Sequence, residues 1–273
     1  MGWETGVEPF IVDRRRLIRF AAAAVSGIGF FGWGKAFAAP RRLPRRPHLV
    51  VLDPGHGGID PGCIGCTGIF EKDITLQLGL GLARELEATG NFHVTLTRSI
   101  DEFIPLEQRV ERARAAGAEL FLSIHADALP DAWMRGASVF TLSEQASDRE
   151  AAALAVRENR ADLVAGVDLS RHSSEVSNIL FDLARRETNN QSIRLARDLV
   201  SELGRRVRLL QHSHRSAGFA VLKAPDVPSA LVEIGCLSNR EEEGLLQQAS
   251  YQRKLANGLA KSVSDYFAAA ASA

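Results

Sequence analysis

The sequence has 273 residues, of which 45% are apolar and 24% are charged, as in ordinary packed domains. A chain of this length buries enough surface to fold without disulfide or metal staples, so intrinsic disorder, collagen-like repeats and a small disulfide scaffold are excluded. Lysine and arginine total 33 and balance the 33 acidic residues, so no global basic field indicates a nucleic-acid partner.

The first 38 residues have the pattern of a cleavable export signal. Paired arginines at residues 14–16 precede an apolar stretch, residues 20–33, which is shorter than the roughly 20 residues that span a bilayer. Ala36-Phe37-Ala38 supplies the small residues of a cleavage site, and the arginine pair resembles a twin-arginine signal, which exports folded proteins. An uncleaved membrane anchor and a buried first helix are the alternatives. Residues 39–47 are rich in proline and arginine and are interpreted as an extended linker.

From residue 48 to residue 268 the sequence alternates between strand and helix patterns. Short β-branched or alternating runs predict strands at residues 48–53, 92–97, 120–125, 136–142, 219–223 and 229–234. The spacing of apolar residues predicts helices at residues 72–86, 106–116, 240–248 and 251–268, with mainly helical patterns from 147 to 210. Strands that alternate with helices predict a single α/β domain, in which helices flank a mixed, mostly parallel sheet of about six strands.

Four polar side chains fall at positions where such a fold would gather them. His56 follows the first strand, His125 closes the third, and Glu233 lies near the end of the last strand, the end at which these sheets bind ligands. Glu71 opens the first long helix, where the helix dipole favours a carboxylate. Two imidazoles and a carboxylate form the ligand set of a catalytic zinc site with an open position for water. A further carboxylate must take the proton, and Glu233 fits because its apolar strand predicts burial and a raised pKa.

Spacing alone leaves a structural interpretation open. The candidates are spread over about 180 positions without a compact HExxH motif, and a lone histidine at the end of a strand is often a structural residue. The structural interpretation applies to the remaining histidines, which are His48, His93, His172, His212 and His214. The glycine-rich turn around His56 is not interpreted as a phosphate loop, because it lacks the Walker A arrangement and a well-placed lysine.

Five sequence blocks together resemble a known family. They are LDPGHGG, GxxEK, the R-x2-D-x-F-x2-L-x2-R stretch from Arg98 to Arg109, FLSIHAD and SALVEIGCLSN. This combination resembles the zinc-dependent N-acetylmuramoyl-L-alanine amidases of bacterial cell walls, over residues 48–267. The resemblance implies that His56, Glu71 and His125 bind Zn²⁺, and that Glu233 is the catalytic base. The implied reaction cleaves the amide between N-acetylmuramic acid and L-alanine in peptidoglycan, and the export signal predicts that it takes place in the periplasm.

Residues 143–190 form a helical segment that the minimal fold does not require. It resembles the regulatory insert of the septum-splitting subclass, whose helix blocks the zinc cleft until an activator with a LytM domain withdraws it. A helix carboxylate could take the open zinc position; our hypothesis is that Glu158 does so, with Glu150 as the second candidate. The alternative is a packed surface hairpin whose acidic side chains are merely solvated. The activator would contact apolar positions of the insert, namely Leu163, Val164, Val167 and Leu169.

The three cysteines leave the redox chemistry of the chain open. Cys63 and Cys66 have CxxC spacing and permit a local disulfide in an oxidising compartment, whereas a second zinc there would lack two ligands. Cys236 lies in an apolar context and is interpreted as a small buried side chain.

Two other functions stay open besides the amidase. One is a wall-binding module that keeps this fold without catalysis, and the other is a metallohydrolase that acts on a different amide. A complete set of metal ligands and a base favours an enzyme, because a pure binder gains nothing from a poised base. We expect a monomer, with no nucleic-acid partner and no stable membrane span once the signal is removed.

Overall fold

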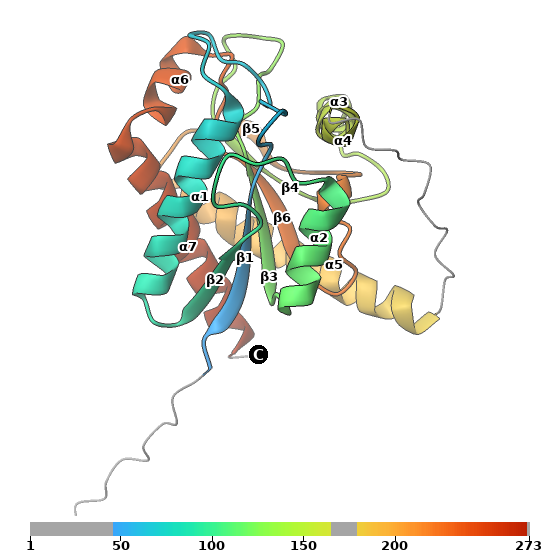
Figure 1. The fold of residues 1–273 in the computed structure, drawn as a ribbon. Coiled ribbons are helices and arrows are strands. Elements are labelled where there is room, and N and C mark those ends of the chain that lie inside the picture. Colours follow the sequence, from blue (N-terminus) through green and yellow to red (C-terminus); the bar gives the residue numbers. More distant parts are fainter. Residues whose placement is uncertain (1–45, 165–178, 272–273) are drawn as a thin grey trace, which may run out of the picture. The chain divides into compact units, whose positions relative to one another are not determined.

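The strands of the protein form one mixed sheet in the order β2-β1-β3-β6-β4-β5 (Figure 1). The computed structural model describes residues 46–164 and 179–271. The strands are β1 His48–Pro54, β2 Phe92–Leu96, β3 Leu120–His125, β4 Ala137–Leu142, β5 Leu209–Ala217 and β6 Ser229–Glu233. β1 pairs in parallel with β2 and β3, and β3 with β6, whereas β4 is antiparallel to β6 and parallel to β5. The predicted α/β fold with a mixed, mostly parallel sheet is confirmed.

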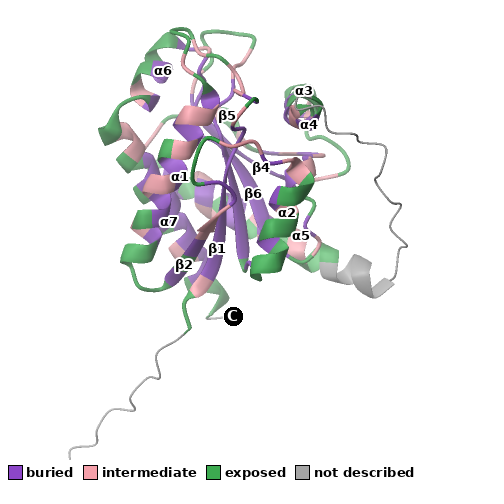
Figure 2. Ribbon diagram, viewed as in Figure 1, coloured by how far each residue is buried: buried purple, intermediate pink, exposed green. Residues whose placement is uncertain are grey.

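Helices cover both faces of this sheet. They are α1 Glu71–Ala88, α2 Leu106–Ala116, α3 Arg149–Glu158, α4 Ala161–Val164, α5 Ile179–Gly204, the short 3-10 helix η2 Ala220–Leu222, α6 Arg240–Leu246 and α7 Ala249–Ala270. α1, α5 and α7 enclose a first apolar core, and α2, α3 and η2 enclose a second one. Successive strand residues point to opposite faces, so Val50 and Leu52 of β1 join the first core and Val51 joins the second. Figure 2 shows the resulting buried strands between partly exposed helices.

Parts of the predicted organisation lie outside the described residues. These parts are the export signal at residues 1–38, most of the linker at residues 39–47, and Val167, Leu169 and His172 of the insert. All the described residues belong to one compact unit. Within them, no helix combines the length and the hydropathy needed to cross a membrane.

Two details of the predicted secondary structure are wrong. The run at residues 219–223 is a 3-10 helix and not a strand, and it is apolar because it packs into the second core. The strand that the sequence does not predict is β5, which follows α5. Helical patterns were expected to continue to residue 210, where β5 has already begun. β5 lies at the sheet edge, and its polar sequence LLQHSHRSA has only two buried side chains, so it lacks the alternation by which a half-buried strand is identified.

A buried carboxylate, Asp53, ties the end of β1 to its neighbours. Asp53 accepts hydrogen bonds from the hydroxyl groups of Thr97, which follows β2, at 2.6 Å and of Ser123 in β3 at 2.7 Å. The guanidinium of Arg109 on α2 lies 2.8 Å from the same carboxylate. Burial by itself raises the pKa of Asp53, but Arg109 and the two hydroxyl groups outweigh it and hold the pKa below its ordinary value. An ionised Asp53 therefore fixes the strand end that leads into His56.

We expect Asp53→Asn to lower the free energy of unfolding by about 3–5 kcal/mol, because it leaves the buried Arg109 guanidinium without its counterion. The contribution of a carboxyl with a depressed pKa is present above its unfolded pKa of about 3.8 and is lost as the pH falls through the folded value. Asp53→Asn should therefore also reduce the loss of stability in acid. Urea unfolding at neutral and at acidic pH measures both effects.

The matched control is Asp226→Asn, which removes an exposed ion pair with Arg114 and should cost about 0–1 kcal/mol. If Asp53→Asn cost no more than this control, Asp53 would not hold the end of β1 in the manner described.

Candidate metal centre

His56 lies in the tight turn that follows β1. Its backbone is left-handed, with a φ of 59°, a conformation that costs a residue other than glycine of order 1–3 kcal/mol. The ring Nδ1 lies 2.8 Å from Oδ2 of Asp60, and both side chains are buried. The carboxylate of Asp60 favours the tautomer with its proton on Nδ1, which leaves Nε2 free to act as a ligand.

Glu71 is the first residue of α1, as the sequence predicts, and its carboxylate is almost completely buried. Oε1 accepts the backbone N–H of Ala126 at 2.9 Å, and Oε2 accepts the backbone N–H of Cys63 at 2.9 Å. These two hydrogen bonds and the helix N-terminus favour the ionised form and fix the direction of both oxygens. Glu71 is thereby held as a charged group in a buried place.

His125 is the last residue of β3, and its ring packs directly on the backbone of the His56 turn. A Cβ atom at Gly55 would lie 2.4 Å from Cε1 of His125, so a side chain at this position would displace the ring. In the same way, a Cβ atom at Gly62 would lie 2.6 Å from both the Glu71 carboxylate and the His56 ring. Glycine at these two positions lets the three polar side chains approach one another.

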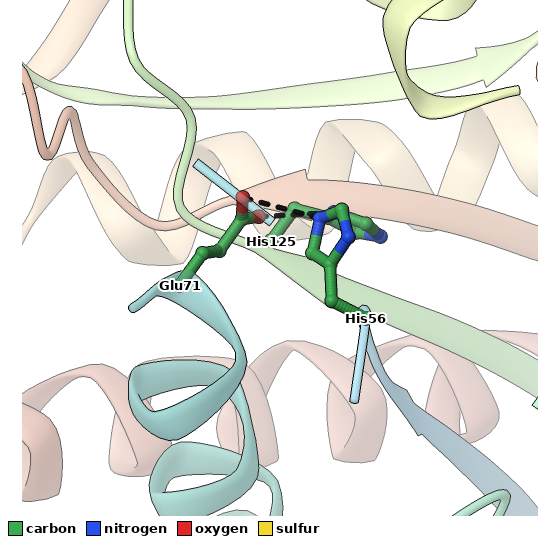
Figure 3. A group of neighbouring side chains, drawn as sticks. All are labelled: His56, Glu71 and His125. Carbon is green, nitrogen blue, oxygen red and sulfur yellow. Dashed lines mark hydrogen bonds and ion pairs between the residues drawn. The ribbon is translucent and has the colours of Figure 1, made fainter. Parts of the chain in front are cut away.

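The side chains of His56, Glu71 and His125 converge, with one potential ligand atom from each within 4.8 Å of the others (Figure 3). Nε2 of His56 and Nδ1 of His125 each lie 3.1 Å from an oxygen of Glu71. Four ligands at tetrahedral vertices about 2.0–2.1 Å from a zinc ion lie about 3.3 Å apart. Nε2 of His56 is also buried without a hydrogen-bond partner among the described residues. The donor set and its spacing therefore fit a divalent metal such as zinc.

The charges of the cluster indicate the same need for a cation. Burial lowers the pKa of His125, but the carboxylates of Glu158 and Glu71 outweigh it and raise the pKa to about 10. Burial also lowers the pKa of His56, and here Glu71, Asp60 and Glu158 raise it well above its ordinary value. The imidazoles in turn hold the pKa of Glu71 well below its usual range, although burial alone would raise it. The imidazoles and the carboxylates thus favour each other's charged forms, and the same carboxylates would favour a bound cation.

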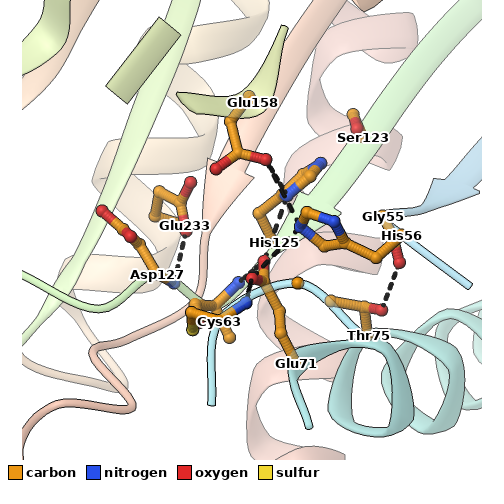
Figure 4. A network of polar contacts seen from close by, with 12 residues as sticks. Gly55, His56, Cys63, Glu71, Thr75, Ser123, His125, Asp127, Glu158 and Glu233 are labelled. Carbon is orange, nitrogen blue, oxygen red and sulfur yellow. Dashed lines mark hydrogen bonds and ion pairs between the residues drawn. The ribbon is translucent and has the colours of Figure 1, made fainter. Parts of the chain in front are cut away.

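Glu233 ends β6, directly opposite His125 in the sheet register. Its Oε2 accepts the backbone N–H of Asp127 at 2.9 Å, and its Oε1 is buried with no hydrogen-bond partner among the described residues. Burial raises its pKa well above the ordinary value, and the nearby carboxylate of Asp127 adds to this. The predicted burial of Glu233 is thus confirmed, and Figure 4 places its carboxylate beside the histidine cluster.

The carboxylate of Glu158, at the end of α3, reaches into the same cluster (Figure 4). Its Oε2 lies 3.1 Å from Nδ1 of His125 and 3.3 Å from Nε2 of His56. Burial would raise the pKa of Glu158, but the two imidazoles lower it to about 2. The preceding Arg157 pairs with Asp127 at 2.5 Å, so two consecutive residues of α3 contact the site. Glu150, in the first turn of the same helix, is exposed.

Three residues that contribute to the site are not identified by the sequence patterns. Asp60 lies four residues after His56 within the glycine-rich turn, and a carboxylate so close to a candidate ligand is a signal that could have identified it. Asp127 belongs to the FLSIHAD block, but its pairing with Arg157 depends on where α3 lies in space. No local pattern marks Arg157 itself, because it is one of many arginines in a charged helical segment.

The remaining histidines and the cysteines take no part in the cluster. Within the described residues, His56, Glu71 and His125 form the one group of potential metal ligands, and His48, His93, His212 and His214 lie outside it. Cys63 and Cys66 are free thiols, which lie 3.1 Å and 3.2 Å from the carbonyl oxygens of Ala126 and Ser238, respectively. Cys236 is buried, as predicted.

Comparison with known proteins shows that the chain is similar to cell-wall amidases. The chain is 43% identical over 220 residues to the N-acetylmuramoyl-L-alanine amidase AmiA of Escherichia coli K12, which covers 80% of this chain and 76% of AmiA. It is 41% identical over 224 residues to AmiC of Escherichia coli O6:H1, covering 82% of this chain and 54% of AmiC. The chain therefore spans about half the length of AmiC.

A solved structure supports the fold. The catalytic domain of CwlV, an N-acetylmuramoyl-L-alanine amidase from Bacillus (Paenibacillus) polymyxa var. colistinus, superposes with a TM-score of 0.57 at 24% identity, covering 81% of this chain and 98% of that chain.

Residues 50–265 match the family described as N-acetylmuramoyl-L-alanine amidase, and this span includes every residue of the cluster. The chain belongs to the N-acetylmuramoyl-L-alanine amidase family.

Proposed function

We propose that this chain is a zinc-dependent hydrolase that cleaves the amide between N-acetylmuramic acid and L-alanine in peptidoglycan. The observation that carries the proposal is the convergence of His56, Glu71 and His125 at the spacing of a tetrahedral zinc site. Zinc held there would polarise the amide carbonyl and lower the pKa of the attacking water. Glu233 takes the proton from that water and passes it to the nitrogen of L-alanine as the amide breaks.

Neighbouring groups orient the side chains that carry out this reaction. Asp60 holds the His56 ring with Nε2 toward the ligand position, and the Ala126 and Cys63 amides hold the Glu71 carboxylate. The backbone N–H of Asp127 directs Oε2 of Glu233, and the unpartnered Oε1 is the atom available to accept a proton. His56, Glu71 and Glu233 are thus each oriented by at least one hydrogen bond to a neighbouring group.

We further propose that α3 keeps the enzyme inactive. Oε2 of Glu158 lies at 3.1 Å and 3.3 Å from the two ligand nitrogens, which is the separation of neighbouring vertices in the same tetrahedron. Glu158 would therefore take the position that the hydrolytic water needs. The burial of Glu158 argues against a merely solvated helix, whereas Glu150 is exposed and matches that alternative.

The proposed biological setting is the separation of daughter cells. The signal at residues 1–38 would export the chain to the periplasm by the twin-arginine pathway, and residues 39–47 would act as a linker. A LytM-domain activator would withdraw α3, and the exposed side chains of Leu163 and Val156 offer it an apolar contact. We expect the enzyme to act as a monomer on the wall polymer.

One experiment distinguishes the amidase from the two other functions, which are a metallohydrolase that acts on a different amide and a wall-binding module without catalysis. The purified chain, the variant Glu158→Ala and a deletion of residues 147–182 are incubated with purified peptidoglycan, and mass spectrometry identifies the products. Released stem peptides with a free L-alanine amine support the amidase. Cleavage of a different amide would support another metallohydrolase, and bound zinc without any product from the three proteins would support a silent wall-binding module.

For the catalytic base, we expect Glu233→Gln in the Glu158→Ala background to keep one zinc per chain and to lose at least about 100-fold in the rate of stem-peptide release. The amide of glutamine cannot accept the proton, while the three metal ligands are unchanged. Metal analysis and the digestion assay measure the two effects separately. Removal of zinc with a chelator should abolish turnover, and turnover by the Glu233→Gln variant at the rate of its parent would disprove the role of Glu233.

For autoinhibition, we expect Glu158→Ala to raise basal hydrolysis by about 10- to 100-fold, since it removes charge-assisted contacts worth about 1.5–3 kcal/mol from the closed state. Deletion of residues 147–182 should raise it further, because the helix then no longer covers the site. Glu150→Ala is the matched control on the same helix and should leave basal hydrolysis unchanged. Unchanged activity in both the Glu158 variant and the deletion would rule out autoinhibition by α3.

A further inference from the structure

Arg98 is the largest of the almost completely buried side chains, and it lies two residues after the end of β2. Its guanidinium donates hydrogen bonds to the carbonyl oxygens of Pro54 at 2.9 Å, Gly55 at 2.8 Å, Lys72 at 2.8 Å and Ile100 at 3.2 Å. The Thr75 hydroxyl lies 3.1 Å from the same guanidinium. All these partners are neutral, so within the described residues Arg98 is a buried cation without a direct carboxylate partner.

The hydrogen bonds of Arg98 join two segments that each carry a proposed metal ligand. The carbonyls of Pro54 and Gly55 belong to the turn that presents His56. The carbonyl of Lys72 belongs to the first turn of α1, which begins with Glu71. A single nitrogen of Arg98, Nη2, contacts both segments, because it donates to the carbonyls of Gly55 and Lys72.

Neighbouring groups reinforce the same connection. The hydroxyl of Thr75 on α1 donates to the Gly55 carbonyl at 2.9 Å, which Figure 4 also shows, and Nζ of Lys72 donates to the Gly58 carbonyl at 2.8 Å. The turn also packs closely against the arginine, since a Cβ atom at Gly57 would be 3.0 Å from Nε of Arg98. The strained backbone around His56 is thus bonded both to Arg98 and to α1.

Arg109 differs from Arg98 in a way that separates stability from positioning. Arg109 contacts the carbonyls of Pro54 and His56, but it also pairs with Asp53 and so belongs to a buried ion pair of the strand end. A buried charge with only neutral partners contributes little net stability, because its desolvation is costly. The planar, rigid set of donors of Arg98 instead fixes the relative positions of the groups to which it donates.

We propose that Arg98 is a positioning residue of the metal centre, which sets the spacing between the His56 turn and the first turn of α1 and so the distance between two ligands. This inference rests on the proposed metal site. Metal–ligand distances tolerate only about 0.2 Å of error, and loss of groups that orient metal ligands costs about 10–100-fold in affinity. Lysine at position 98 keeps the charge but loses the planar, rigid set of donors that bonds both segments and the Pro54 carbonyl together.

The test measures the zinc affinity of the full chain by competition with a chromophoric chelator, for the wild type, Arg98→Lys and Arg112→Lys. Arg112 is the matched control, because its guanidinium donates to the Thr97 carbonyl at 2.6 Å, beside Arg98, and contacts neither ligand segment. We expect Arg98→Lys to weaken zinc binding by about 10–100-fold and Arg112→Lys to leave it unchanged. The visible absorption spectrum of the cobalt-substituted protein should change with Arg98→Lys only, because it reports the ligand geometry directly.

Thermal unfolding of the metal-free proteins separates positioning from stability. If Arg98→Lys keeps the zinc affinity and the cobalt spectrum of the wild type, the proposal is overturned. It is also overturned if Arg98→Lys and Arg112→Lys are destabilised equally and lose zinc affinity equally. If Arg98→Lys does not fold, Thr75→Val decides, because it removes only the hydroxyl that ties Gly55 to α1; a weakened affinity supports the proposal and an unchanged one overturns it. A wild-type chain that binds no zinc would instead refute the proposed function.

Discussion

The site depends on one electrostatic constraint, which is that a buried crevice holds more carboxylates than cationic side chains. Glu71, Asp127, Glu158 and Glu233 are each at most 6% exposed, and Arg157 is the arginine that faces them. The carboxylates of Glu71 and Glu158 raise the pKa of His56 and His125, so positive charge is favoured at this point. A divalent cation supplies the same charge at the point where the ligand atoms converge, so metal and protons compete for one position.

The parallel part of the sheet brings these groups together. The carboxyl ends of β1, β3 and β6 lie side by side, with Pro54 opposite Ile124 and His125 opposite Glu233. Residues separated by many positions in the sequence therefore meet at one end of three neighbouring strands. Glu71 is added by α1, the helix that follows β1, and Arg98 donates hydrogen bonds both to the His56 turn and to α1. The geometry of the cluster is thus a consequence of strand register together with a few buried polar contacts.

The sequence predicts those features that depend on local patterns and on the family blocks. The central strands are recognisable because both faces are buried, and the candidates His56, His125 and Glu233 are recognisable because each stands at a strand end. The edge strand β5 escaped because its side chains are mostly polar and its identity depends on pairing with β4. The role of Arg98 escaped for a related reason: the motif contains the residue, but only the folded chain brings the carbonyls that it bonds to one place.

The insert is attached to the domain by more than the contact of Glu158 with the histidines. Ala151, Leu154 and Ala155 of α3 are buried in the second core, and Asp148 caps the helix by accepting the Ala151 N–H at 2.7 Å. Beyond the helix, the Asn159 side chain bonds the backbone of Gly218 and Ala220 at 2.9 Å and 2.7 Å. Under the proposed autoinhibition, loss of Glu158 frees one metal position, whereas full opening must also break this packing. Shifting such an equilibrium from almost closed to almost open takes about 5.5 kcal/mol, which a partner can supply only by binding the withdrawn helix much more tightly than the docked one.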